Sequence, residues 1–192
     1  MKTKDHKELS DYLMTQFHYP VKKELRRAVI LGSIEPDYNP ITYLRGSLKI
    51  EKFRGHNFEN AHHCIKRLIY KIETGNMSEI KRCYLLGKLL HYVADAFTFP
   101  HNKAFKGTLA EHCSYEMELH GYMERALQRQ SVDWVQIRSN KSLMDQIDDM
   151  HQKYLDEPHG YRTDFCYILD AVALVFEYFS EEYADCWKEQ AA

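Results

Sequence analysis

Helical periodicity extends over most of the chain and constrains its fold more than any other feature. Glycine and proline are scarce, with 8 and 5 copies, and no run of alternating apolar and polar residues stands out as a half-buried strand would. The sequence therefore predicts an all-α fold, a multi-helix bundle. The expected helices cover residues 5–17, 21–30, 57–73, 78–98, 108–129, 139–156 and 162–184.

Local signals mark several helix ends. Thr108 and Glu111 have the spacing of a capping box, in which both side chains satisfy backbone N–H groups of the first helical turn. Pro100 disfavours helix at the residue before it and predicts the end of the helix at 78–98. The segment 31–56 holds three of the eight glycines and two of the five prolines, so we expect a long loop, and such loops often carry function.

The last expected helix contains the most apolar stretch of the chain, Phe165–Phe179. This stretch is fifteen residues long and carries Asp170 and Glu177, so it is too short and too charged to span a bilayer. Because it is apolar on nearly every face, we expect it to be a central helix that is packed on several sides. Asp170 would then either orient a ligand histidine or be an ordinary buried, hydrogen-bonded carboxylate.

Length, charge and cysteine content limit the class of protein. The 192 residues suit a single domain, 1–192. The formal net charge is −2 and the one dense basic cluster lies at 22–27, so no nucleic-acid partner is expected. The five cysteines form no C-x-x-C pair and the N-terminus is too polar for a signal peptide, which predicts reduced thiols and a cytoplasmic location.

The stretch HYVADAFTFPH at 91–101 places polar residues where the pattern predicts a buried helix. His91 and Asp95 are four residues apart, so they share one helix face. Burying such groups without partners costs roughly 2–7 kcal/mol each. His101 follows Pro100 and can project in a direction that the helix does not offer. These three residues therefore need partners, or a ligand.

The same i, i+4 spacing recurs at His112 and Glu116. The expected loop adds Asp37 and His56, and the first helix adds His6. Imidazole and carboxylate groups together suit catalytic zinc. A carboxylate such as Asp95 can bridge two metal ions, and two-metal sites are used to cleave phosphate esters.

Each piece also has an ordinary structural interpretation. A His–Asp pair at this spacing is often a surface ion pair, and Asp37 after a proline fits a turn. His6 fits an exposed histidine near a helix start. His120, on a helix with a polar face, is expected to be a surface or ordinary core histidine, as are His62, His63, His151 and His159.

The segments resemble the bacterial zinc-dependent phospholipases C, whose fold is shared with the S1/P1-type nucleases. LGKLLHYVADAFTFPH (86–101) is similar to the family helix G-x-x-x-H-Y-x-x-D with its following proline and histidine. HCSYE (112–116) is similar to the family's H-x-x-x-E. PDYNP (36–40) and FRGH (53–56) resemble its loop aspartate and the histidine that follows.

The resemblance implies two zinc ions and leaves a third open. Secreted members use the amine and carbonyl of an N-terminal tryptophan at the third site, whereas this chain begins with Met1. Asp37 would double as the general base, and Tyr38 and Phe53 match aromatic positions that line a choline pocket. The implied metal ligands are Asp37, His56, His91 and Asp95 for one ion, His101, His112 and Glu116 for a second, and Asp95 with His6 for the third.

We therefore expect a zinc-dependent hydrolase of phosphodiester bonds that acts on phospholipid head groups, with peripheral contact to a membrane surface left open. One alternative is a nuclease-like phosphodiesterase on the same site. Another is a metal-binding sensor or scaffold without turnover. The oligomeric state is not predicted by the sequence.

Overall fold

The computed structural model describes residues 1–17, 20–39, 58–129 and 140–187. Within these ranges the elements are helical and no strand is present, which confirms the expected all-α fold. None of the described helices is both long and apolar enough to cross a membrane. In chain order the elements are α1 (Thr3–Gln16), α2 (Lys23–Tyr38), α4 (Phe58–Thr74), α5 (Glu79–Ala96), the 3₁₀ helix η1 (Phe99–His101), α6 (Leu109–Leu127), α7 (Leu143–Asp156), α8 (Tyr161–Glu182) and α9 (Ala184–Trp187).

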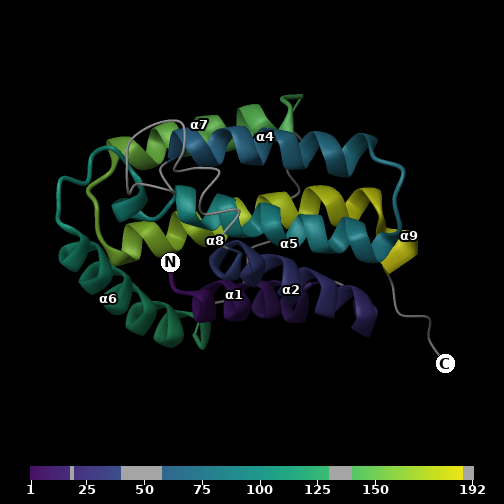
Figure 1. Cartoon of the computed structure of the whole chain (residues 1–192), viewed down its shortest axis with the longest axis horizontal. Coiled ribbons are helices and arrows are strands. Elements are labelled where there is room, and N and C mark those ends of the chain that lie inside the picture. The colour runs from purple at the N-terminus through teal and green to yellow at the C-terminus, as the bar shows by residue number, and fades with distance from the viewer. Residues whose placement is uncertain (18–19, 40–57, 130–139, 188–192) are drawn as a thin grey trace.

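The helices form three layers (Figure 1). α5 and α8 pack together in the middle, α4 and α7 lie on one side of them, and α1 and α2 lie on the other. α6 lies at one end of the bundle, where the N-terminus is also found. The end of α5, the starts of α8 and α1, and α6 therefore meet in one region.

α8 is the central helix that its composition predicts. Its residues are buried without interruption from Ala171 to Phe176, and consecutive helix positions point in different directions around the axis. The expectation for Asp170 is wrong, because this residue is exposed. The buried carboxylate of the first turn is Asp164.

α2 is longer than the sequence predicts. The loop expected from residue 31 begins no earlier than the end of α2, so Asp37 lies in a helix and not in a turn. Gly32 does not break the helix but lets it cross α5 closely, since a Cβ atom there would meet the Tyr84 carbonyl oxygen at 2.0 Å. Gly87 faces the same crossing from α5, where a Cβ would lie 2.0 Å from the Val29 carbonyl oxygen.

The local end signals are otherwise confirmed. Thr108 and Glu111 form the capping box at the start of α6, with the Thr108 N–H donating to Glu111 Oε2 at 2.6 Å. α5 ends at Ala96, and Pro100 lies in the short η1 that follows. The rest of the expected loop, 40–57, lies outside the described residues.

Candidate metal centre

The close crossing of α2 and α5 determines how His91 is held. Its Nδ1 donates a hydrogen bond to the Ser33 carbonyl oxygen at 2.9 Å, because a carbonyl can only accept. In the neutral imidazole, Nε2 then carries the lone pair. That atom lies 3.3 Å from Asp95 Oδ2, and both side chains are buried. Two electron-rich atoms therefore face each other in the core, an arrangement that a cation would stabilise.

His6 of α1 completes this first group. Its ring stacks on His91 with centroids 3.8 Å apart, and its Nε2 lies 3.3 Å from Asp95 Oδ1. The geometry is not that of a hydrogen bond, and the buried Nε2 has no hydrogen-bond partner among the described residues. Burial, reinforced by the neighbouring His91, lowers the pKa of His6 to about 4, so this ring is neutral near pH 7. A buried neutral imidazole beside a buried carboxylate fits the predicted metal ligand, and the alternative interpretation of His6 as an exposed histidine is wrong.

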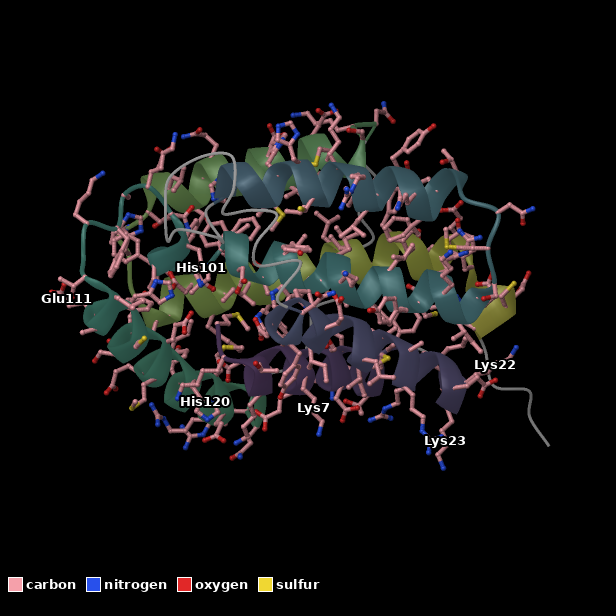
Figure 2. All side chains as sticks on the ribbon, in the orientation of Figure 1. Lys7, Lys22, Lys23, His101, Glu111 and His120 are labelled. Atoms are coloured by element: carbon pink, nitrogen blue, oxygen red, sulfur yellow. The ribbon has the colours of Figure 1, made fainter. Side chains whose placement is uncertain are left out.

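A second group forms around one oxygen of Glu116. His101 Nε2 from η1 lies 3.1 Å from Glu116 Oε1, and His112 Nε2 from α6 lies 3.0 Å from the same atom. Burial alone would raise the pKa of Glu116, but the hydrogen bonds from His101 and His112 outweigh it and hold the pKa well below its ordinary value. Figure 2 shows His101 beside the end of α5, whereas Glu111 projects from the outer edge of α6.

The amine of Met1 lies between the two groups. Its nitrogen is 2.9 Å from Asp95 Oδ1, 2.9 Å from Glu116 Oε1 and 3.2 Å from His101 Nε2. Burial would lower its pKa, but the two carboxylates raise it to about 11. This ammonium supplies positive charge at the point where the two groups converge. The resemblance names an N-terminal amine as a ligand in secreted family members, but the side-chain pattern alone could not predict that the Met1 amine lies at this point, because a backbone amine leaves no trace in that pattern.

Asp37 lies at the rim of this centre. Its Oδ1 is 3.8 Å from His91 Nε2, and its Oδ2 accepts a hydrogen bond of 2.7 Å from the Thr3 hydroxyl. The neighbouring Tyr38 is 72 % exposed. His56 and Phe53 lie outside the described residues. The structure thus gathers every predicted metal ligand that it describes: His6, Asp37, His91, Asp95, His101, His112 and Glu116.

His120 has a partner that its surroundings in the sequence did not suggest. Its Nδ1 lies 2.5 Å from Oδ1 of the buried Asp5, whose Oδ2 accepts from the Lys2 N–H at 3.1 Å. The pair ties the start of α1 to α6. Together with Glu8, Asp5 and His120 form a third set of close donor atoms. Because α1 begins two residues after Met1, this pair helps to fix where the Met1 amine lies.

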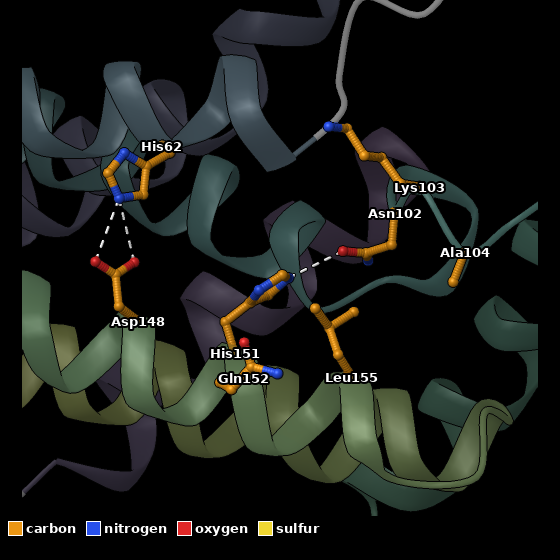
Figure 3. A pocket seen from close by; sticks show the side chains of 8 residues that line it. All are labelled: His62, Asn102, Lys103, Ala104, Asp148, His151, Gln152 and Leu155. Carbon is orange, nitrogen blue, oxygen red and sulfur yellow. Dashed lines mark hydrogen bonds and ion pairs between the residues drawn. The ribbon is translucent and has the colours of Figure 1, made fainter.

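A cavity of about 500 Å³ lies between α4, α7 and the segment after η1 (Figure 3). His62 Nε2 and Asp148 Oδ1 face each other across it at 3.2 Å. His151 Nε2 lies 2.9 Å from Asn102 Oδ1, and burial lowers the pKa of His151 to about 4. None of the predicted ligands lines this cavity, so it is separate from the metal centre.

An all-α bundle that gathers imidazoles and carboxylates from α1, α5, η1 and α6 has the donor set of a zinc hydrolase. Comparison with known families agrees. The chain belongs to the zinc-dependent phospholipase C family, whose sequence model matches residues 5–161. The matched range contains both ligand groups, and the family indicates zinc dependence and a phospholipase C-like hydrolase. No curated protein and no solved structure matches the chain.

Proposed function

We propose that the protein is a zinc-dependent phosphodiester hydrolase that acts on phospholipid head groups. The observation that carries the proposal is the convergence of two ligand groups on the carboxylates of the buried Asp95 and the partly buried Glu116, both of which lie 2.9 Å from the Met1 amine. A family of phospholipases and a donor set suited to more than one zinc ion support the same chemistry.

Each group of side chains would hold its own zinc ion. His91 and Asp95, with Asp37 and His56, would hold one zinc ion, and His101, His112 and Glu116 would hold a second. Zinc ions bound there would activate water at neutral pH and neutralise charge on the phosphoryl oxygens.

Asp95 is suited to a bridging role because its two oxygens face different partners. His6 approaches Oδ1 and His91 approaches Oδ2, both at 3.3 Å. With Oδ1 also accepting from the Met1 amine, Asp95 would connect the first ion to a third position near His6 and Met1. The amine could take part as a ligand only after it loses its proton, since an ammonium has no lone pair.

Asp37 would be the general base. It lies at the solvent-facing rim, with its side chain 23 % exposed, so water and substrate can reach it. The Thr3 hydroxyl holds Oδ2 and leaves Oδ1 turned toward His91. A carboxylate at this edge can accept the proton of a water that attacks phosphorus.

The test combines metal analysis with a substrate panel. Protein purified without chelator should contain at least two zinc equivalents and should hydrolyse phosphatidylcholine vesicles and a soluble phosphocholine ester faster than single-stranded DNA or RNA. Less than one equivalent, with no gain on adding zinc, would overturn the catalytic proposal. Preferential cleavage of nucleic acid would establish the nuclease-like alternative, and tight zinc binding without any turnover would establish the sensor or scaffold.

A further inference from the structure

Asp164 is a fully buried carboxylate that no predicted role covers. It lies in the first turn of α8 and accepts three hydrogen bonds. Its Oδ2 accepts from the Phe99 N–H and from the Tyr115 hydroxyl, each at 2.9 Å. Its Oδ1 accepts from the Tyr154 hydroxyl, also at 2.9 Å. A carboxylate with three donors in the core is well satisfied, and removing it would leave those donors without an acceptor.

The donors on Oδ2 come from the two segments that carry the second ligand group. Phe99 begins η1 and lies two residues before His101. Tyr115 lies on α6, directly before Glu116. Because both donors meet at a single oxygen atom, Asp164 fixes η1 and α6 relative to each other. The distance between His101 and Glu116 depends on that relation.

Oδ1 has a different kind of partner. Tyr154 belongs to α7, which contributes none of the predicted ligands. Oδ2 of Asp164 therefore contacts the segments that carry the metal ligands, whereas Oδ1 contacts a helix that only packs in the bundle.

We propose that Asp164 is a positioning residue that holds His101 and Glu116 in the geometry needed to bind one zinc ion between η1 and α6. The inference rests on the proposed function for the identity of the ion. Asp164 touches neither substrate nor metal, and it acts through the Phe99 N–H and the Tyr115 hydroxyl.

The turn that carries His101 also has a support on its far side. Asn102 Nδ2 donates to the carbonyl oxygens of Ala96 and Thr98, at 3.1 and 3.0 Å. His151 holds the Oδ1 of the same amide at 2.9 Å. Loss of the Asp164 contacts should therefore shift the turn and leave it folded, so that variants at this site can be studied as folded proteins.

Tyr115→Phe and Tyr154→Phe form a matched pair for the test. Each removes one hydroxyl from Asp164 and keeps the aromatic ring, and Tyr154 is the more deeply buried of the two. Zinc-loaded full-length protein is titrated with a chromogenic chelator, and the retained zinc is counted by elemental analysis. The absorption spectrum of the cobalt-substituted protein reports ligand geometry, and thermal unfolding of the zinc-free protein reports stability.

We expect Tyr115→Phe to release one zinc equivalent at a roughly 10–100-fold lower chelator concentration than the wild type. Loss of a hydrogen-bond partner of a metal ligand typically weakens metal affinity by that factor. The cobalt spectrum of Tyr115→Phe should change as well. Tyr154→Phe should keep the zinc affinity and the cobalt spectrum of the wild type. It should nevertheless lower the melting temperature of the zinc-free protein at least as much as Tyr115→Phe does.

Asp164→Asn provides a second measurement. Its amide oxygen can face the Phe99 N–H and the Tyr115 hydroxyl while its Nδ2 donates to the Tyr154 oxygen. We expect this variant to retain zinc nearly as the wild type does, whereas Asp164→Leu, which has no acceptor, should lose one equivalent. A folded Asp164→Asn protein that lacks that equivalent would contradict the inference.

Equal effects of the two tyrosine variants on zinc, or no effect of either, would show that Asp164 serves packing alone. These measurements use no substrate. A wild type that binds zinc but cleaves no phosphodiester would therefore overturn the proposed function and leave the inference standing. A wild type that binds no zinc would overturn both.

Discussion

The metal centre and the cavity of Figure 3 contain the same kinds of side chain but arrange them differently. In the cavity, His151 Nε2 lies 3.1 Å from the Ala96 carbonyl oxygen and 2.9 Å from Asn102 Oδ1, and His62 pairs with the partly exposed Asp148. In the metal centre, imidazole nitrogens from separate helices point at a shared carboxylate group, His6 and His91 at Asp95, and His101 and His112 at Glu116. Histidine and aspartate alone therefore do not identify a metal site. The convergence of imidazoles on shared carboxylates is what distinguishes the candidate metal centre from the cavity.

The comparison can be tested most severely at one aspartate from each region. Asp95→Asn should lose bound zinc and lower phosphodiester hydrolysis by more than the ~100-fold that loss of an outer-shell partner can cost, because Asp95 faces both His6 and His91. Asp148→Asn removes the carboxylate of a similar His–Asp pair and should leave zinc content and activity unchanged. Elemental analysis and initial rates on both proteins provide the measurement. Similar losses in the two variants would mean that the ligand face has been misassigned.

A second test compares two buried histidines. His6→Ala should remove at most one zinc equivalent and leave the fold intact. His6 is a ligand of the third zinc position, which has fewer side-chain ligands than the other two. His151→Ala should keep all zinc and lose roughly 1–3 kcal/mol of stability, because Asn102 Oδ1 loses its donor, whereas the Ala96 carbonyl oxygen still accepts from Asn102 Nδ2. Zinc counts and urea unfolding separate the two outcomes. Unfolding of the His6 variant, or loss of all its zinc, would place His6 in the core or in the main cluster.

The third test uses pH. The folded-state pKa of His151 is lowered to about 4 from an ordinary value of 6.5. Below pH 6.5 the unfolded chain therefore binds a proton that the folded protein does not, so His151 lowers stability progressively as pH falls from 6.5 to 4. The full effect is roughly 3 kcal/mol for a shift of this size. Urea unfolding of zinc-free wild type and His151→Gln at pH 7.5 and 4.5 measures it, and an equal pH slope in both proteins would contradict the assignment.

The features that could be predicted from the sequence are those that depend on the spacing of residues close together in the chain. Helix positions follow from periodicity, and the pairs His91/Asp95 and His112/Glu116 follow from the i, i+4 rule, which holds in any helix. The extension of α2 could not be read in this way. Gly32 signals a break unless a second helix packs against it, and that information lies in the tertiary structure.

The missed contacts join residues that are distant in the sequence. Asp5 and His120 are separated by 115 residues, and so are Met1 and Glu116. For Asp164 and Asp170 the difficulty is of another kind. α8 is apolar on almost every face, so its pattern does not reveal which of its aspartates points inward.

The smallest expected effect concerns the rim of the metal centre, where Tyr38 follows Asp37 and is 72 % exposed. A quaternary ammonium donates no strong hydrogen bond, so an aromatic face is its natural partner, and such a contact contributes about 0.5–2 kcal/mol. We therefore propose a weak preference for choline- or ethanolamine-type phosphodiesters over uncharged ones.

Tyr38→Ala should reduce that preference several-fold, measured as the ratio of kcat/KM on phosphocholine and uncharged esters, and Phe53→Ala should act in the same direction. Tyr70 provides the matched control, because it is 65 % exposed on α4 and distant in sequence from every predicted ligand. Tyr70→Ala should leave the ratio unchanged. If Tyr38→Ala also leaves it unchanged, the aromatic ring beside Asp37 does not contact the head group. If Phe53→Ala lowers stability at a constant ratio, Phe53 belongs to the core, and the preference must then originate from the charge of the centre itself.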